Sequence, residues 1–273
     1  MYEEKHQIEF DNIIERIYER QKEIFKNKKY NNIYEFIPKI YYIGLGKTGS
    51  SSTGLSFQNE NVAHWHSVEY FEKCYQITYL SSHNLDLYDL ILYIGDKFNF
   101  KPLIIENIRE PISLNISFIY QHIKFDRGCD INCQMCKMKN ITDEQQQLNF
   151  IKKFIEFDLI NYKPESIEMY KKHFNIDIIK EFDNQKHYYI FENDKVKLLL
   201  FKYEYLHLFE DVIHKYTNYN CKIGKHNITT KKYIKDNLQI DKSILTNIYS
   251  QDYYLNYFYN PTEIQNFIIK YKN

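Results

Sequence analysis

The feature that most constrains this chain is a short apolar strand that runs directly into a loop of small residues. Residues 39–45 (Lys-Ile-Tyr-Tyr-Ile-Gly-Leu) have the composition of a strand buried in a sheet. Residues 46–53 (Gly-Lys-Thr-Gly-Ser-Ser-Ser-Thr) follow at once, and their hydroxyl side chains can cap a helix that reaches about Gln58. A strand, a small-residue turn and a helix in this order indicate an α/β fold.

Hydrophobic periodicity predicts further strands that alternate with helices. Strands are predicted at residues 61–66, 76–82, 102–108, 187–191 and 197–203. Helices are predicted at residues 4–27, 85–97, 111–124, 143–158 and 164–173, and in a mostly helical tail whose last helix begins at Pro261. This alternation predicts a P-loop-like, mostly parallel central sheet flanked by helices. Because the chain shows no internal repeat or linker, residues 1–273 are expected to form a single domain, with an N-terminal helix within residues 1–28.

The charge balance and the hydropathy of the chain limit its possible partners. Lysine plus arginine and aspartate plus glutamate each number 36, so the formal net charge is zero. A neutral chain lacks the broad positive field that non-specific nucleic-acid binding requires. The start of the chain shows no secretory signal, and apolar runs such as residues 90–94 are far too short to span a membrane. The protein is therefore expected to be cytoplasmic, with no transmembrane segment.

The loop at residues 46–53 has the chemistry of a phosphate site. Its backbone N–H groups and the N-terminus of the following helix offer partial positive charge, and Lys47 adds a full one. The loop residues small enough to let a ligand approach the backbone are Gly46, Gly49, Ser50 and Ser51. The loop is not a Walker A motif, because the first glycine of that motif would fall at Tyr41. The alternative is a plain strand–turn–helix with an incidental lysine.

A second group for the same ligand follows the strand predicted at residues 102–108. Arg109 ends this strand, and a helix is predicted to begin two residues later. In that helix Ser113 and Ser117 are four residues apart and share a face. The guanidinium of Arg109 could hold a phosphate through two parallel hydrogen bonds, and a serine hydroxyl could complete the pocket. The alternative is a surface arginine paired with Glu110.

The five cysteines are an odd number, and they are expected to be reduced thiols or metal ligands. Three of them form C-x₃-C-x₂-C within a polar, Cys-rich insert at residues 125–142: Cys129, Cys133 and Cys136. Structural zinc prefers four such ligands, and His122 or Cys221 could supply the fourth. Reduced thiols or a local disulfide are the alternatives. Cys74 and Cys221 are otherwise expected to pack in the interior.

The two phosphate-binding motifs occur in an order that resembles a known family. The resemblance is carried by Gly-Lys-Thr-Gly-Ser-Ser at residues 46–51 and by Arg-Glu-Pro-Ile-Ser-Leu-Asn-Ile-Ser at residues 109–117. Looser likenesses lie at residues 173–177, 202–206, 227–233 and 253–259. The chain thus resembles the capsular polysaccharide synthesis family, whose proteins look like sulfotransferases that use PAPS (3′-phosphoadenosine 5′-phosphosulfate). The likeness covers residues 40–260, with the Cys-rich insert as the main departure.

This resemblance implies transfer of a sulfuryl group from PAPS to a hydroxyl acceptor, with a glycan as the expected acceptor. In such enzymes an arginine and a serine hold the 3′-phosphate of the donor, and they correspond to Arg109 and Ser117. The 5′-phosphosulfate end is held by the loop residues Gly46, Lys47, Thr48, Gly49, Ser50 and Ser51. Sulfuryl transfer depends mainly on positioning and charge stabilisation, so Lys47 would neutralise charge on the leaving phosphate oxygen.

The acceptor hydroxyl needs a general base, for which histidine is the usual choice. His66 lies at the end of a predicted strand, and His64 shares its face by alternation, so the two could act together. His83 follows the strand predicted at residues 76–82 and is the second candidate. Glu69 is a further alternative.

Two other functions remain open from the sequence. A P-loop nucleotide or small-molecule kinase would need a carboxylate at a strand end, and Asp96 is the candidate, although residues 90–95 before it favour a helix. A catalytically inactive protein with this fold could instead bind carbohydrate through some of its 27 tyrosines and 19 phenylalanines.

Overall fold

The computed structural model describes residues 3–24, 37–43, 57, 62–65, 67–125, 143–157, 166–223, 236–251 and 255–272. The strands are β1 (Ile40–Ile43), β2 (Val62–Trp65), β3 (Leu103–Ile108), β4 (Tyr188–Glu192) and β5 (Lys197–Lys202). The helices are α1 (Glu4–Ile24), α3 (Val68–Tyr75), α4 (Tyr79–Ser82), α5 (Leu87–Phe98), α6 (Pro111–Phe125), α8 (Glu144–Phe157), α9 (Ser166–Phe174), α10 (Ile178–Glu181), α11 (Phe209–Tyr216), α13 (Lys242–Gln251), α14 (Leu255–Phe258) and α15 (Pro261–Tyr271), with a 3₁₀ segment at Tyr203–Leu208.

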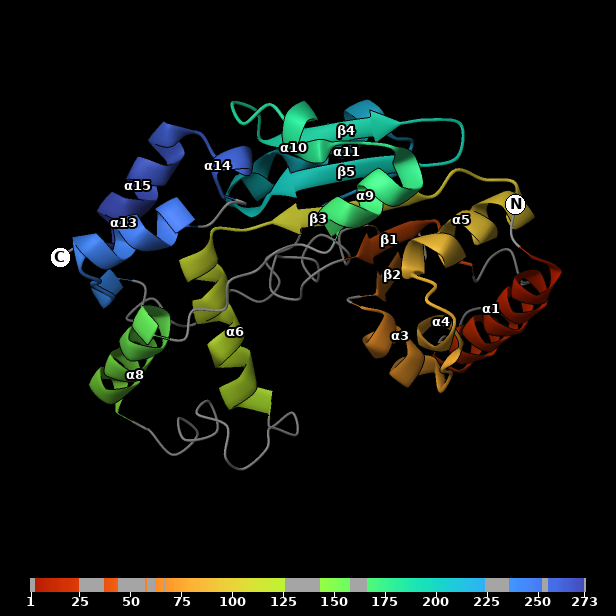
Figure 1. Ribbon diagram of the computed structural model, residues 1–273, viewed down its shortest axis with the longest axis horizontal. Helices are drawn as coiled ribbons and strands as arrows, with labels where there is room; N and C mark the ends of the chain where they lie inside the picture. The colour runs from red at the N-terminus through yellow and green to blue at the C-terminus, as the bar shows by residue number, and fades with distance from the viewer. Residues whose placement is uncertain are drawn as a thin grey trace.

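The strands form one five-stranded sheet in the order β2-β1-β3-β5-β4 (Figure 1). Strands β2, β1, β3 and β5 run parallel, and β4 at the edge runs antiparallel to β5. In Figure 1 the carboxyl ends of β3 and β5 point toward the side where α6 begins and where α14 and α15 lie. The sheet confirms the predicted α/β class with a mostly parallel centre and flanking helices.

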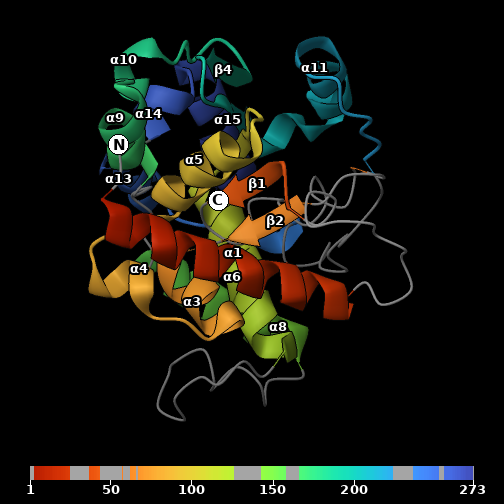
Figure 2. The same cartoon turned by 90° about the vertical axis from the view of Figure 1, so that its right-hand side faces the viewer.

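Helices cover both faces of the sheet, which is why its central strands are nearly continuous apolar runs. Successive side chains of β1 point to opposite faces. Tyr41 enters the larger core, where its ring lies 5.1 Å from that of Trp65, whereas Tyr42 enters a smaller core with Phe209 of α11. In Figure 2, α5 and α9 lie on one side of the sheet and α11 on the other.

The strand predicted at residues 76–82 is wrong, because this segment contains α4 and follows α3, which was not predicted. Gln76 has a φ of 55° and so ends α3 in the left-handed region. Ile77 and Leu80, three residues apart, then pack on the larger core with helical spacing. The buried carboxylate of Glu72 accepts hydrogen bonds from the backbone and the hydroxyl of Ser81, which holds the turn against α3.

The remaining predicted strands match β1 to β5, and the long predicted helices match α1, α5, α6, α8, α9 and α15 within a few residues. Pro261 begins α15 as expected, with a capping box between Asn260 and Glu263. In the part of the chain that the structure describes, no helix has both the length and the apolar character needed to cross a bilayer.

Candidate functional site

The carboxyl ends of β1 and β3 mark the point where the strand order reverses. From β1 the chain passes to β2 on one side of β1. It then returns to β3 on the other side of β1, and β5 lies beyond β3 in the same direction. In open parallel sheets, ligands bind outside the carboxyl ends of the strands at such a point. The loop predicted to bind phosphate follows β1 in the sequence, and Arg109 follows β3. The loop residues Gly46, Lys47, Thr48, Gly49, Ser50 and Ser51 lie outside the described residues.

Arg109 is buried at this edge, with 6% of its surface exposed. Its Nε and Nη2 groups donate hydrogen bonds to the Ser113 hydroxyl at 3.1 and 2.8 Å. Its guanidinium carbon lies 4.0 Å from the centre of the Tyr203 ring. The alternative of a surface arginine is therefore wrong. Ser113 lies one turn nearer to Arg109 than Ser117, which is half-buried on the same helix.

The carboxylate of Glu110, which is 1% exposed, caps the first turn of α6. It accepts hydrogen bonds from the backbone N–H groups of Ile112 and Ser113 at 2.7 and 2.8 Å. The hydroxyls of Tyr249 and Tyr271 donate to the same carboxylate at 2.7 and 3.3 Å. Burial, followed by the negative charge of Glu110, raises the pKa of both tyrosines. The positive end of α6 is thus already occupied by the Glu110 carboxylate, beside Arg109.

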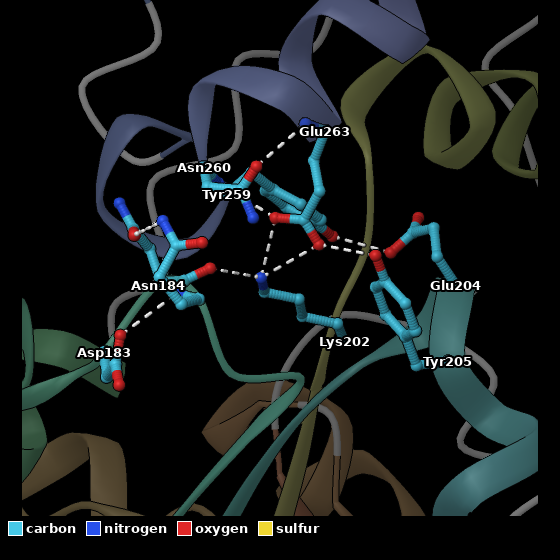
Figure 3. A network of polar contacts seen from close by, with 9 residues as sticks. Asp183, Asn184, Lys202, Glu204, Tyr205, Tyr259, Asn260 and Glu263 are labelled. Atoms are coloured by element: carbon cyan, nitrogen blue, oxygen red, sulfur yellow. Dashed lines mark hydrogen bonds and ion pairs between the residues drawn. The ribbon is translucent and has the colours of Figure 1, made fainter.

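At the carboxyl end of β5 a lysine is buried in a network of polar contacts (Figure 3). Lys202 is 0% exposed, and its ammonium donates to both carboxylate oxygens of Glu263 at 3.0 and 2.8 Å. It also donates to the backbone oxygen of Asn184 at 2.9 Å, and the Tyr205 hydroxyl donates to Glu263 at 2.7 Å. Burial lowers the pKa of Lys202, and the pairing with Glu263 opposes this change. The ion pair fastens α15 to the sheet.

A second carboxylate continues this network toward β3. Glu204 accepts hydrogen bonds from the backbone N–H of Glu110 at 3.0 Å and from the Tyr259 hydroxyl at 2.8 Å. Burial raises the pKa of Glu204, although the hydrogen bonds that it accepts oppose the change. The carboxylates that follow β3 and β5 are therefore engaged in holding the strand ends and the C-terminal helices together.

Asp86, Asp89 and His173 form the one group among the described residues whose ligand atoms are spaced for a metal ion, within 4.8 Å of one another. Asp86 and Asp89 already form the capping box of α5. The ammonium of Lys172 lies 2.8 Å from Asp86, and Nε2 of His173 lies 2.7 Å from the same oxygen. Burial raises the pKa of Asp86, but hydrogen bonds from His173 and Lys172 outweigh it and bring the pKa to about 2. These contacts connect α5 to α9.

The candidate general bases are placed in different parts of the structure. His83 follows α4, not a strand, and its ring stacks on that of Tyr79. Its Nδ1 contacts the backbone oxygen of Tyr79 at 3.0 Å, and its Nε2 lies 3.3 Å from the ammonium of Lys5 in α1. These contacts belong to α1 and α4, which lie away from the start of α6 (Figure 1).

Two other candidates lie near the carboxyl end of β2. The ring of His64 contacts that of Tyr42 on β1, with centroids 5.2 Å apart, on the face of the smaller core. Glu69 is exposed in the first turn of α3. His66 lies outside the described residues.

The cysteines are separated in the structure. Cys129, Cys133 and Cys136 lie outside the described residues, so the proposed zinc site is not described. Cys221 is buried in the smaller core, as predicted, whereas the prediction that Cys74 is interior is wrong, since its side chain is exposed. Cys74 lies near the end of α3, two residues after the buried Glu72, and therefore on the opposite side of the helix.

Sequence reasoning did not predict the roles of Tyr203, Lys202 and Glu263. In the sequence, residues 202–206 showed only a loose likeness to the capsular polysaccharide synthesis family, which assigned no role to these side chains. The Asn-Pro-Thr-Glu stretch at residues 260–263 is a capping signal for α15, but nothing local in it indicates a lysine partner 61 residues away.

Comparisons of the chain with protein-family models, with curated proteins and with solved structures found no match.

Proposed function

We propose that this chain is a PAPS-dependent sulfotransferase with a P-loop-like fold, which moves a sulfuryl group to a hydroxyl of a carbohydrate. The observation that carries the proposal is the position of Arg109 at the carboxyl end of β3. The adjacent parallel strand, β1, leads into the loop that contains Lys47. Neighbouring strands lie about 4.8 Å apart, so one nucleotide can reach from one strand end to the next.

In this proposal the two motifs bind opposite ends of the donor. Arg109 binds the 3′-phosphate, and Ser117, on the helix that Arg109 precedes, adds a hydroxyl. Lys47 and the backbone of the loop from Thr48 to Ser51 bind the 5′-phosphosulfate. A buried arginine suits this role, because a charge-assisted contact is stronger where water is excluded.

The reaction is an in-line displacement at sulfur. The acceptor oxygen forms a bond to sulfur as the bond between sulfur and the 5′-phosphate oxygen breaks, and adenosine 3′,5′-bisphosphate leaves. Lys47 stabilises the negative charge on the leaving oxygen. The base takes the acceptor proton. His66, one residue beyond β2, is favoured over His83, whose ring is held against α1 and α4.

The arrangement of the described carboxylates favours this reaction over a magnesium-dependent kinase. Asp96 lies within α5 and not at a strand end. Glu110 and Glu204, which do follow strands, accept hydrogen bonds from backbone and tyrosine groups. A kinase would need a strand-end carboxylate directed at a metal–phosphate complex.

Calorimetry with adenosine 3′,5′-bisphosphate, in Mg²⁺ and in EDTA, tests the proposal. We expect the same affinity in both buffers. Arg109→Ala should weaken binding about 10- to 100-fold, because it removes charge-assisted hydrogen bonds. The control Arg20→Ala removes an exposed arginine of α1 and should change nothing.

One result would contradict the proposal, and another would contradict only the role given to Lys47. Affinity for ATP that requires Mg²⁺, with none for the bisphosphate, would indicate a kinase. If the Lys47→Ala variant transfers sulfate from PAPS to simple sugars at the wild-type rate, Lys47 does not stabilise the leaving oxygen.

A further inference from the structure

The ring of Tyr203 lies beneath Arg109 because of the register between two strands. Ile108 pairs with Lys202 in the parallel ladder of β3 and β5, so Arg109 and Tyr203 are the next residues outward on the two strands. One residue further on, the backbone N–H of Glu110 donates a hydrogen bond to the carboxylate of Glu204 at 3.0 Å, which connects the segments that follow β3 and β5. The register therefore brings the guanidinium and the ring side by side, and they lie 4.0 Å apart.

Ser113 holds the same guanidinium from a different element. Its hydroxyl accepts from Nε and Nη2, which form one edge of the planar group. The backbone of Ser113 is in turn held by Glu110, whose carboxylate accepts its N–H at 2.8 Å. The ring and the hydroxyl together define both the plane of the guanidinium and its rotation within that plane.

Such a fixed guanidinium matters for phosphate recognition. An arginine side chain loses about 2 kcal/mol of rotamer entropy when it is immobilised. If the protein has already immobilised it, that cost does not fall on the ligand. The side chains of Tyr203 and Ser113 are both uncharged. Lys202, the residue before Tyr203, is instead paired with the carboxylate of Glu263.

We infer that Tyr203 and Ser113 are positioning residues that orient Arg109 for the 3′-phosphate of the nucleotide. This inference rests on the proposed function, since it assumes that Arg109 meets that phosphate. Tyr203 acts through the face of its ring, so its hydroxyl is not required.

The test compares two nucleotides by calorimetry on the full chain: adenosine 3′,5′-bisphosphate and adenosine 5′-monophosphate, which lacks the 3′-phosphate. Tyr203→Leu should weaken binding of the bisphosphate about 3- to 30-fold, the range of a cation–π contact, and leave the monophosphate unchanged. Tyr203→Phe keeps the ring and should bind both nucleotides as the wild type does. In the Arg109→Ala background, Tyr203→Leu should have no further effect on the bisphosphate.

The outcomes separate this inference from the proposed function. If the wild type does not bind the bisphosphate more tightly than the monophosphate, the assignment of Arg109 to the 3′-phosphate is wrong, and the inference is wrong with it. If the wild type makes this distinction but Tyr203→Leu binds normally, only the positioning role is wrong. Equal weakening of both nucleotides by Tyr203→Leu would also overturn it, because the ring would then support the fold and not the guanidinium.

Discussion

The carboxyl ends of β3 and β5 each bury a cation, and the two cations are held in different ways. Lys202 is paired with a carboxylate through two oxygens and lies in a network that fastens α15. Arg109, one residue beyond the neighbouring strand, is oriented by a hydroxyl and an aromatic ring. Burial of a charged side chain therefore does not by itself indicate a ligand site, since the buried ammonium of Lys202 serves to hold α15 against the sheet.

The comparison predicts that breaking the pair at β5 costs mainly stability. Glu263→Gln leaves the ammonium of Lys202 buried without its counter-charge and should cost about 3–5 kcal/mol of unfolding free energy. Urea denaturation measures this loss. The control Glu23→Gln breaks an exposed pair with Arg20 and should cost less than about 0.5 kcal/mol.

Adding Lys202→Met to Glu263→Gln should restore part of the lost stability, since the unpaired charge is then gone. A loss below about 1 kcal/mol for Glu263→Gln would contradict the structural role given to the pair.

The contacts of Asp86 with Lys172 and His173 should contribute less stability than the buried Lys202–Glu263 pair and more than the exposed Arg20–Glu23 pair. Their contribution should also depend on pH. Asp86 has a folded pKa of about 2 against an ordinary value of 3.8, so its ionised form stabilises the fold above pH 4. This stabilisation is lost as the pH falls from 4 toward 2. Asp86→Asn keeps the cap of α5 but removes the charge, and it should cost about 2 kcal/mol at pH 7.

Urea unfolding of the wild type and of Asp86→Asn across this pH range measures the effect, and the difference between them should shrink toward pH 2. A difference independent of pH would show that the Asp86 charge is not what connects α5 to α9.

At β3 the expected cost is in ligand binding and not in stability. Arg109→Lys keeps the positive charge but loses the planar fork that Tyr203 and Ser113 orient. Binding of adenosine 3′,5′-bisphosphate should weaken about tenfold, while the urea midpoint changes little. Unchanged affinity would mean that only the positive charge at this position is needed, and that its orientation by Tyr203 and Ser113 does not contribute to binding.

The smallest effect is expected from the serines of α6. Ser113→Ala removes one hydrogen-bond acceptor from the Arg109 guanidinium and should weaken bisphosphate binding about 2- to 10-fold. Ser117→Ala, one turn further along the same face, tests whether a second hydroxyl contacts the phosphate directly. Calorimetry with both variants shows which serine completes the pocket, and no change in either would exclude this face of α6.

Much of the architecture follows from local sequence patterns. Apolar runs predicted β1, β3 and β5, and Pro111 and Pro261 marked the starts of α6 and α15. The alternation of strands and helices predicted a mostly parallel sheet, which placed Arg109 at a carboxyl edge. The segment at residues 76–82 was misread because a single apolar alternation is too short to distinguish a strand from a one-turn helix.

The sequence by itself determined which residues are apolar, where the helices begin, and that Arg109 follows a buried strand, because these properties depend on neighbours within a few positions. Only the tertiary structure decided that Tyr203 lies under Arg109, that Ser113 accepts hydrogen bonds from it, and that Lys202 meets Glu263. Those contacts depend on strand register and on how the C-terminal helices dock. Both are set by packing over the whole core, so no short stretch of sequence carries them.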